Sequence, residues 1–196
     1  MQQKRQTLTK QKIKEVLTEL ITEKGLSAIT VSDITRRAGI NRGTFYLHYL
    51  DKLDLIDQLE QEVIDDLTAI LLAESSTNQE EKNLDLFPYP LILQALQYVK
   101  SDFEFFNALT NRGRNQAFVE HFKAILGQLI HQKCQTHHIK SIRVHNMPDD
   151  YSHELILSHI SAIIVLWIRK GAIEPEEDIA HMINDLKSFL PFELEG

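Results

Sequence analysis

The chain has 196 residues, 43% of them hydrophobic, with 7 Gly, 5 Pro and one Cys. This length allows one or two domains, and the scarcity of Gly and Pro favours helices over turn-rich sheets. A lone cysteine excludes an internal disulfide and suits a reducing compartment. The N-terminus lacks a signal-peptide pattern, and the longest apolar run, 163–168, is far shorter than the roughly 20 residues of a membrane span. We therefore expect a soluble, cytoplasmic protein that has no contact with a membrane.

The formal net charge of −7 is unevenly divided along the chain. Residues 1–52 contain ten Lys or Arg and five Asp or Glu. Residues 53–196 contain eleven Lys or Arg and twenty-three Asp or Glu. The N-terminal quarter is therefore basic, with a net charge of +5, on an acidic remainder of −12. This division predicts that only the N-terminal part meets a polyanion such as nucleic acid.

The N-terminal quarter has the pattern of short helices. Residues 1–8 are polar and basic, and we expect them to form a flexible arm before a helix capped by Thr9. Gly25 follows the last apolar residue of that helix, as a C-terminal glycine does. Thr30 and Asp33 have the spacing of a capping box that opens a second helix.

A third helix and a fourth helix follow closely. Gly39 suits a turn that needs positive φ, and Asn41 can cap the third helix, with Phe45 and Tyr49 facing inward. Asp51 can cap the fourth. We place a helix-turn-helix domain at residues 9–52 and a second helical domain at residues 53–196.

The second domain shows helical periodicity and no strand pattern. A polar stretch at 74–83 predicts a linker, and 137–148 predicts a loop. Pro175 is expected at the first position of the last helix. The other helices are expected near Leu91–Val99, Asp102–Leu109, Asn115–Gln132 and Tyr151–Lys170. The sequence therefore predicts an all-α fold of about nine helices.

The segment from Asn41 to His48 has the chemistry of a DNA-reading helix, since a helix-turn-helix places the start of its second helix in the major groove. Arg42 can bind guanine through two hydrogen bonds, and Thr44 can contact a base edge or a thymine methyl group. Gly43 costs helix stability, which close approach to DNA would explain. The predicted DNA-contacting residues are Thr30, Arg36, Arg37, Asn41, Arg42, Gly43, Thr44, Tyr46, His48 and Lys52.

Within this set, phosphate contacts would position the protein and base contacts would specify sequence. Lys52 lies at a helix start, which also favours a phosphate. Each residue has a plainer alternative when taken singly. Tyr46 could be a packing residue, His48 an ordinary surface histidine, and Arg36 and Arg37 a solvated face.

Residues from about 7 to 67 resemble the DNA-binding domain of the TetR/AcrR family of bacterial transcriptional regulators. The resemblance rests on Gly25, Thr30-Val31, Asp33-Ile34, Ala38-Gly39-Ile40, Gly43-Thr44, Tyr46, Tyr49, Lys52 and Leu55. It implies a homodimer on a palindromic double-stranded DNA operator, with Tyr46 and Lys52 on phosphates. Arg42 to Tyr49 also resemble a Firmicutes-type branch that includes dihydroxyacetone-kinase regulators. Thr35 and Tyr49 stand where the family usually has Ala and Phe.

The resemblance also implies that the last two helices form a four-helix dimer interface and that middle helices hold an unknown small-molecule effector. Dimer-interface candidates are Ile160, Ile163, Ile164, Ile179, Met182, Ile183 and Leu186. Aromatic and polar candidates for the effector site are Tyr98, Phe105, Phe106, Phe118, Phe122, His159 and Trp167. Plain core packing is the alternative for each of the latter.

Three kinds of chemistry are not supported. His131, Cys134 and His138 share a helical face, but a closed zinc site needs four ligands and the chain has one cysteine, so we expect no metal. We find no phosphate-binding loop, no cofactor site and no catalytic constellation. The leading hypothesis is a ligand-responsive regulator, most often a repressor. The alternative is a co-activator that acts through protein contacts with little DNA binding; an enzyme is disfavoured.

Overall fold

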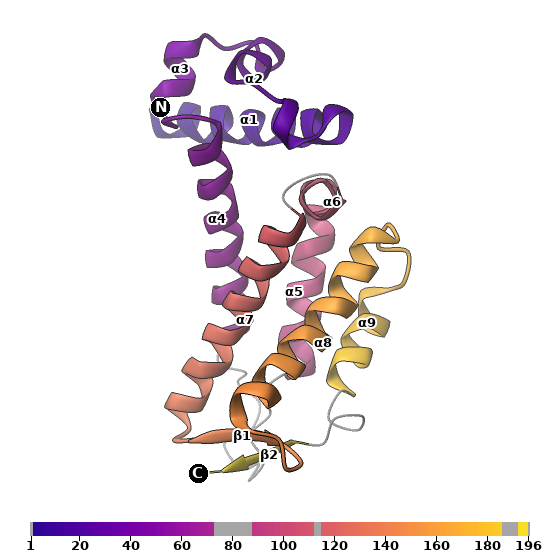
Figure 1. The fold of residues 1–196 in the computed structure, drawn as a ribbon. Coiled ribbons are helices and arrows are strands. Elements are labelled where there is room, and N and C mark those ends of the chain that lie inside the picture. The colour runs from indigo at the N-terminus through magenta and orange to yellow at the C-terminus, as the bar shows by residue number, and fades with distance from the viewer. Residues whose placement is uncertain (1, 73–87, 112–114, 186–191, 196) are drawn as a thin grey trace. The chain divides into compact units, whose positions relative to one another are not determined.

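The computed structural model of the chain describes residues 2–72, 88–111, 115–185 and 192–195 (Figure 1). The predicted linker at 74–83 and the interface candidate Leu186 lie outside these ranges. The contacts divide the chain into two compact units. The first comprises Met1–Asp65 with Glu104–Asn115, and the second Asp66–Phe103 with Gln116–Gly196. This division falls inside helix α4, Lys52–Leu72.

The first unit holds the N-terminal helices. Their bounds are α1 Gln2–Lys24, the 3-10 helix η1 Leu26–Ala28, α2 Val31–Ala38 and α3 Arg42–Tyr46. Because α1 begins at Gln2, the predicted arm at residues 1–8 and the N-cap at Thr9 are corrected. Residues 2–8 contain neither Gly nor Pro, and Gln, Lys and Arg are good helix formers, so nothing there stops the helix.

The predicted caps of the short helices are confirmed. Gly25 and Gly39 have φ of 75° and 64°, which favours glycine at both helix ends. Thr30 and Asp33 form a reciprocal capping box, and the side chain of Asn41 caps α3. Phe45 and Tyr49 are buried in the core of this unit with Ile34, as the sequence predicts.

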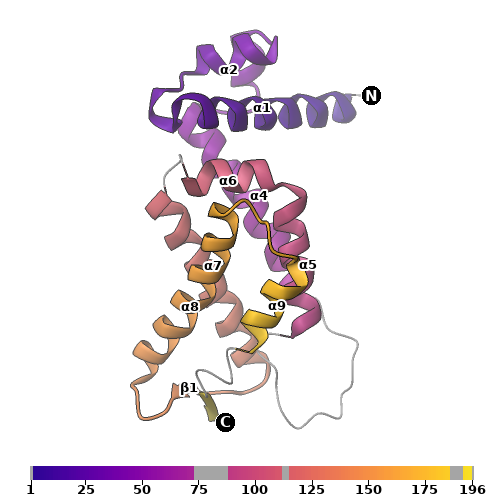
Figure 2. The same cartoon turned by 90° about the vertical axis from the view of Figure 1, so that its right-hand side faces the viewer.

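Six further helices follow in the described part of the chain. Their bounds are α4 Lys52–Leu72, α5 Tyr89–Ser101, α6 Phe103–Asn111, α7 Asn115–Thr136, α8 Asp149–Arg169 and α9 Glu176–Asn184. In the second unit α9 lies against both α5 and α8 (Figure 2). Pro175 is the N-cap residue of α9 and not its first helical residue. The fold is all-α, as predicted.

A small antiparallel sheet corrects the expectation of no strands. Strand β1, Ser141–Val144, lies within the predicted loop and pairs with β2, Phe192–Glu195. The amide of Val144 also donates a hydrogen bond of 3.0 Å to the hydroxyl of Ser152 in α8. Four-residue strands give too short an alternation to detect, and their pairing partners lie about fifty residues apart in sequence.

Helix α8 corrects the expectation that no segment is long and apolar enough to span a membrane. Among the described helices it alone meets those criteria, and 44% of its most apolar window is buried within the protein. Ile156, Ile160 and Trp167 are among its buried residues. Core helices pass the same test, so this property is weak evidence for a membrane.

Candidate nucleic-acid interface

The start of α2 is held by hydrogen bonds and an ion pair. The amide of Asp33 donates to the Thr30 hydroxyl at 3.2 Å, and the amide of Thr30 donates to the Asp33 carboxylate at 3.0 Å. The Lys24 ammonium lies 2.8 Å from the same carboxylate. Lys24, followed by Thr30, holds the pKa of Asp33 well below its usual range. The Thr30 side chain, predicted to contact DNA, therefore serves as a cap.

The adjacent Arg36 and Arg37 have different environments. The Arg37 guanidinium donates to both carboxylate oxygens of Glu23 and lies 3.5 Å from Glu19, so it fastens α2 to α1. Arg36 pairs with Asp33 at 3.0 Å, and its side chain is 80% exposed. Of these two predicted DNA-contacting residues, Arg36 is the more exposed, since the Arg37 side chain is 38% exposed.

Helix α3 begins in a local network around Asn41. The Asn41 side-chain oxygen accepts the amide of Thr44 at 2.7 Å and the Thr44 hydroxyl at 3.0 Å. A Cβ at Gly43 would lie 3.2 Å from that oxygen, closer than ordinary van der Waals contact. The absence of a side chain at Gly43 is therefore explained by its contact with Asn41, besides the close approach to DNA that the sequence suggested.

Arg42 connects the two helices of the motif and is exposed. Its guanidinium donates a hydrogen bond to the hydroxyl of Ser32 in the first turn of α2. An arginine held by one hydroxyl keeps most of its five donors for another partner. Arg42 therefore remains suited to guanine, which takes two parallel hydrogen bonds.

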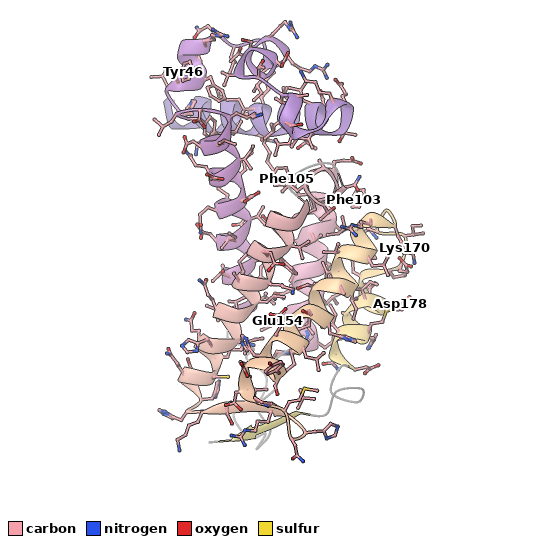
Figure 3. All side chains as sticks on the ribbon, in the orientation of Figure 1. Tyr46, Phe103, Phe105, Glu154, Lys170 and Asp178 are labelled. Carbon is pink, nitrogen blue, oxygen red and sulfur yellow. The ribbon has the colours of Figure 1, made fainter. Side chains whose placement is uncertain are left out.

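Tyr46 is the last residue of α3 (Figure 3). His48 follows it in the connection to α4. Tyr46 is 53% exposed, and its ring meets the buried Phe45 edge-on, with 5.5 Å between ring centres. Tyr46 is therefore exposed enough to contact a partner, and it also packs against Phe45, as the alternative interpretation proposed. His48 is half-buried, and its ring centre lies 6.1 Å from that of Tyr49.

Two exposed leucines were missed by the sequence analysis. Leu47 and Leu50 are 81% and 82% exposed in the connection between α3 and α4. Leu47 lies two residues from both Phe45 and Tyr49, a spacing that turns it away from their buried face on a helix. This two-residue spacing is the sequence signal from which the exposure of Leu47 could have been predicted. Both leucines therefore present apolar side chains to solvent in the segment that follows Tyr46.

Lys52 has hydrogen-bond partners within the protein that the sequence did not predict. Its ammonium donates hydrogen bonds of 2.9 Å to the carbonyls of Leu26 and Ile29. The start of α4 is already capped, because the Asp51 carboxylate accepts the amides of Leu53 and Asp54 at 2.7 and 2.9 Å. The predicted phosphate site at this helix start is therefore filled by the protein's own groups.

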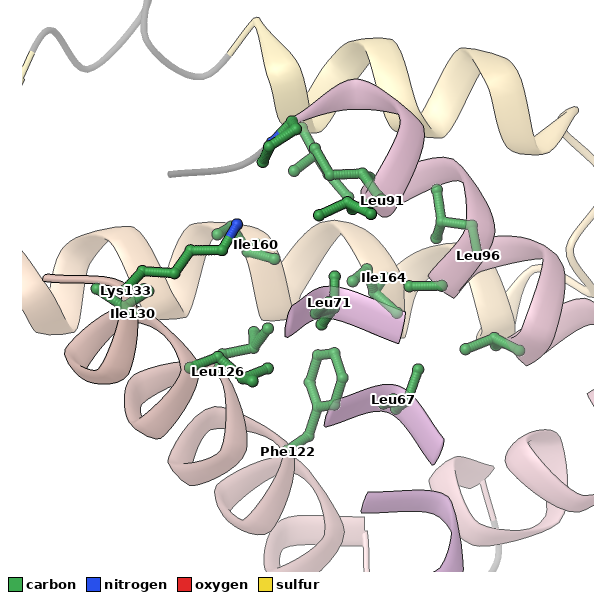
Figure 4. Close-up of a pocket in the computed structure, with 16 residues that line it drawn as sticks. Leu67, Leu71, Leu91, Leu96, Phe122, Leu126, Ile130, Lys133, Ile160 and Ile164 are labelled. Atoms are coloured by element: carbon green, nitrogen blue, oxygen red, sulfur yellow. The ribbon is translucent and has the colours of Figure 1, made fainter. Parts of the chain in front are cut away.

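The second unit contains a partly open apolar cavity of about 60 Å³ (Figure 4). Of the predicted effector-site residues whose side chains are described, Phe122 alone lines it. Tyr98 instead donates a hydrogen bond of 2.8 Å to Asp66. Phe105 and Phe106 are buried in the first unit, where the Lys14 ammonium lies 4.5 Å from the Phe105 ring centre. The side chain of Phe118 lies outside the described part of the chain.

His159 and Trp167 do not share a site. Trp167 is 1% exposed, and its indole N–H donates to the carbonyl of Glu174 at 3.0 Å, whereas His159 is exposed. Eight residues advance a helix by slightly more than two turns, which leaves the two side chains about 80° apart. That rotation separates a buried position from an exposed one.

The interface candidates fall into two groups. Ile160, Ile164 and Ile183 line the cavity, and Ile179 is buried. Ile163 is half-buried, and Met182 is 51% exposed. Leu166, which the sequence analysis missed, is 59% exposed on α8.

His131, Cys134 and His138 do not lie on one helical face, contrary to what the sequence had suggested. Helix α7 ends at Thr136, and His138 has a left-handed φ of 58°, so the i, i+3, i+7 arrangement breaks. Cys134 is buried, and burial raises the pKa of its thiol. Within the described residues, no group of three or more His, Cys, Asp or Glu could hold a metal ion.

Two sequence families match this chain. Residues 13–59 match bacterial regulatory proteins of the tetR family, and residues 88–188 match a transcriptional regulator C-terminal region. The second match covers just over half of the chain. The chain belongs to the TetR family. This is a family of DNA-binding transcriptional regulators, and its helix-turn-helix architecture agrees with the prediction.

Curated relatives of this TetR-family chain include two bacterial regulators. The uncharacterized HTH-type transcriptional regulator YxbF of Bacillus subtilis is 28% identical over 179 residues, covering 90% of this chain and 44% of YxbF. The HTH-type transcriptional regulator AcrR of Shigella flexneri is 35% identical over 51 residues, 26% of this chain and 24% of AcrR. The chain thus spans less than half the length of each of these relatives.

Solved structures of similar fold cover nearly the whole TetR-family chain. NalD of Pseudomonas aeruginosa, the secondary repressor of the MexAB-OprM multidrug efflux pump, has a TM-score of 0.60 at 23% identity, covering 95% of this chain and 98% of its own. The dihydroxyacetone kinase operon activator DhaS has a TM-score of 0.59 at 18% identity, covering 94% and 97%. FadR of Bacillus subtilis, solved with stearoyl-CoA, has a TM-score of 0.62 at 17% identity, covering 90% of this chain and 96% of its own. At these identities the likeness concerns the fold alone.

Proposed function

We propose that this protein is a cytoplasmic transcriptional repressor that binds a palindromic operator as a homodimer and releases it on binding a small molecule. The observation that carries the proposal is the exposed Arg42 at the start of α3, held by Ser32 of α2. A helix-turn-helix reads bases with this part of its second helix. The basic charge of residues 1–52 supports the same role.

Different residues contribute to different parts of the contact. Arg42 reads guanine, and Thr44 contacts a base after its hydroxyl leaves Asn41. Arg36 and Tyr46 are exposed and contact phosphates, which position the protein without reading sequence. Arg37 and Lys52 position the reading helix, because their charged groups are held by Glu23 and by backbone carbonyls.

The homodimer is proposed to form through α8 and α9. Leu166 and Met182 are the exposed apolar residues at 59% and 51%, and Ile163 adds a half-buried contact. A self-complementary patch would bury these groups against a second copy about a two-fold axis. We expect Leu166→Glu to shift the protein to monomers in sedimentation velocity, whereas Leu47→Glu, at an exposed leucine of the first unit, is the control and should keep the dimer. An unchanged dimer would exclude this face.

The repressor is proposed to work by a shift of populations. Two recognition helices must lie about one helical turn of DNA, roughly 34 Å, apart. An effector that binds better to a state with another spacing lowers operator affinity by its differential affinity for the two states. Helix α4 is a continuous chain segment that carries Lys52 at its start and Leu67 and Leu71 of the cavity wall near its end.

The test of DNA recognition is a gel-shift titration with the promoter region upstream of the protein's own coding sequence. We expect Arg42→Ala to lose about 1–3 kcal/mol on the specific site, and little on random DNA. The control is Arg143→Ala, which removes an exposed arginine paired with Asp149 in the other unit. If Arg42→Ala keeps the wild-type ratio of specific to random binding, Arg42 does not read bases.

A co-activator that works through protein contacts is the second candidate. It is favoured by the similar fold of DhaS, an operon activator, and by the exposed Leu47 and Leu50. A pull-down from lysate with and without nuclease separates the two functions. Partners that survive nuclease and depend on Leu47 would support the co-activator.

A further inference from the structure

Leu47 continues the helical geometry of α3 beyond its last residue. Its backbone lies in the right-handed helical region, and its amide donates a hydrogen bond of 3.1 Å to the carbonyl of Gly43. The amide of Tyr49 likewise donates to the carbonyl of Phe45 at 3.0 Å. Positions along this segment can therefore be compared as positions on a helix of about 3.6 residues per turn.

Leu47 lies on the face of this helix opposite the core. Phe45 and Tyr49 are buried, and Leu47 is about 160° from each of them around the helix axis. Gly43 and Thr44 precede Leu47 by four and three residues, so they share its face. The Leu47 side chain is 81% exposed. The face formed by Gly43, Thr44 and Leu47 is therefore the one that a helix-turn-helix can insert into the major groove.

The side chain of Leu47 is directed toward the residues at the start of α3. Side chains on a helix lean toward its N-terminus, so Leu47 leans over the turn that contains Gly43 and Thr44. Gly43 has no side chain, which leaves room on the outward side of that turn. The methyl group of Thr44 is the other apolar group there. Leu47 therefore extends an apolar strip along the reading face.

The base edges offer one apolar group that matches this strip. In the major groove the C5 methyl group of thymine is apolar, whereas the other groups that distinguish the bases are hydrogen-bond donors and acceptors. A leucine placed against a donor, an acceptor or a phosphate would remove that group from water without replacing its hydrogen bonds. Contact with the methyl group removes only apolar surface from water, which is favourable. The continuity of Leu47 with the reading face favours DNA over a protein as its partner.

We propose that Leu47 is a specificity-determining residue that reads a thymine through its C5 methyl group, one helical turn beyond the start of α3. The inference rests on the proposed function only in requiring that the chain binds specific DNA sequences. Arg42 reads its base through hydrogen bonds, whereas Leu47 reads by apolar contact. Each half-site of the operator therefore contains a thymine whose methyl group meets Leu47.

The test compares thymine with deoxyuridine, which lacks the C5 methyl group and keeps every hydrogen-bonding group of the base. The DNA is a duplex that the full-length protein selects from a random library, so the operator need not be known beforehand. Each thymine is replaced in turn, and fluorescence anisotropy measures the affinity. We expect one position per half-site at which the replacement weakens wild-type binding about fourfold, the equivalent of about 0.8 kcal/mol for one buried carbon group.

Leu47→Ala shows whether the leucine reads that thymine. The variant should bind the thymine duplex about fourfold more weakly per half-site, and deoxyuridine at the sensitive position should then weaken binding no further. Leu50→Ala is the matched control, because Leu50 is 82% exposed but follows the helical segment, and it should keep the fourfold thymine effect. A thymine effect that persists in Leu47→Ala, or that is absent at every position in the wild type, would overturn the inference. Since both leucines are exposed, the thermal unfolding midpoints of both variants should match that of the wild type.

The outcomes separate this inference from the proposed function. Binding to the protein's own promoter without a Leu47-dependent thymine rejects the inference alone. A Leu47-dependent thymine on the selected duplex, in a protein that does not bind its own promoter, rejects the proposed function alone. A protein that selects no duplex rejects both. In that case a nuclease-resistant partner that the Leu47→Ala variant loses would assign the leucine to a protein contact.

Discussion

The ammonium of Lys52 donates a hydrogen bond of 2.9 Å to the carbonyl of Ile29, the residue before the N-cap of α2. A second bond of the same length goes to Leu26. The first turn of α4 is therefore tied to the turn that precedes α2. Lys52 thus has a structural role in joining these two segments, and its predicted contact with a DNA phosphate stays a prediction.

Lys52→Met should destabilise the protein by about 1–3 kcal/mol, because two partly buried carbonyls lose a charged donor. Urea denaturation followed by circular dichroism measures the change. Lys170→Met, which removes an exposed ion pair with Glu174, is the matched control and should stay within about 1 kcal/mol of the wild type. Equal stability of the two variants would contradict a structural role for Lys52.

Arg36 and Arg37 should differ in DNA binding although they are adjacent. Arg36→Ala removes an exposed cation, so the slope of log affinity against log salt should fall by about 0.9 for one lost phosphate contact. Arg37→Ala should leave that slope unchanged and lower thermal stability slightly, since its guanidinium is held by Glu23. Fluorescence anisotropy at several salt concentrations measures both slopes. A larger loss of slope in Arg37→Ala would reverse the assignment.

Tyr49→Phe should leave stability unchanged or raise it by up to about 1 kcal/mol. The phenol oxygen is buried without a hydrogen-bond partner in the described part of the chain, so its removal relieves a desolvation cost. Phe45→Leu, which changes packing in the same core, should be destabilising. Thermal unfolding at pH 7 compares the variants, and a clear loss in Tyr49→Phe would indicate a partner for the hydroxyl.

The same tyrosine should give the protein an alkaline sensitivity. Burial, followed by the charges of Glu62 and Asp54, raises the pKa of Tyr49 to about 12. The unfolded chain releases this proton near pH 10, so the stability it contributes is full below that pH and is lost as pH rises toward 12. Denaturation midpoints from pH 9 to 11.5 should fall less steeply in Tyr49→Phe than in the wild type.

Asp33 should give a sensitivity at acidic pH. Lys24 and Thr30 lower the pKa of its carboxyl, so its contribution is full above the unfolded pKa of about 4 and is lost as pH falls below it. Asp33→Asn should flatten the decline of stability between pH 5 and 3. Asp57→Asn, which changes an exposed carboxyl group on α4, is the control and should keep the wild-type profile. The outcome that counts against this role is an unchanged profile in Asp33→Asn.

Local structure in the first unit was predictable because its signals are short in sequence. The Thr30–Asp33 capping box, Gly39 in the left-handed region and the Asn41 cap each depend on residues within a few positions. The buried pair Phe45 and Tyr49 follows from helical spacing alone. The exposure of Arg42 could also be expected, because it is polar at a helix start.

The partners of long side chains were not predictable. Lys52 reaches carbonyls that lie 23 and 26 residues away, and Arg37 reaches Glu23 of another helix. Periodicity also cannot say which part of a largely apolar helix is covered. Ile160 and Ile164, which were predicted to lie in a dimer interface, therefore line a cavity within the chain.

The sequence by itself determined the caps of α2 and α3, the all-α class, the family and the basic character of the N-terminal quarter, since each is recorded in residues near one another along the chain. Only the tertiary structure decided which charges are already paired, which apolar residues line the cavity, and that residues 141–144 meet 192–195 in a sheet. The physical reason is that these features join distant segments. Their energies depend on packing and desolvation in three dimensions, which local spacing does not encode.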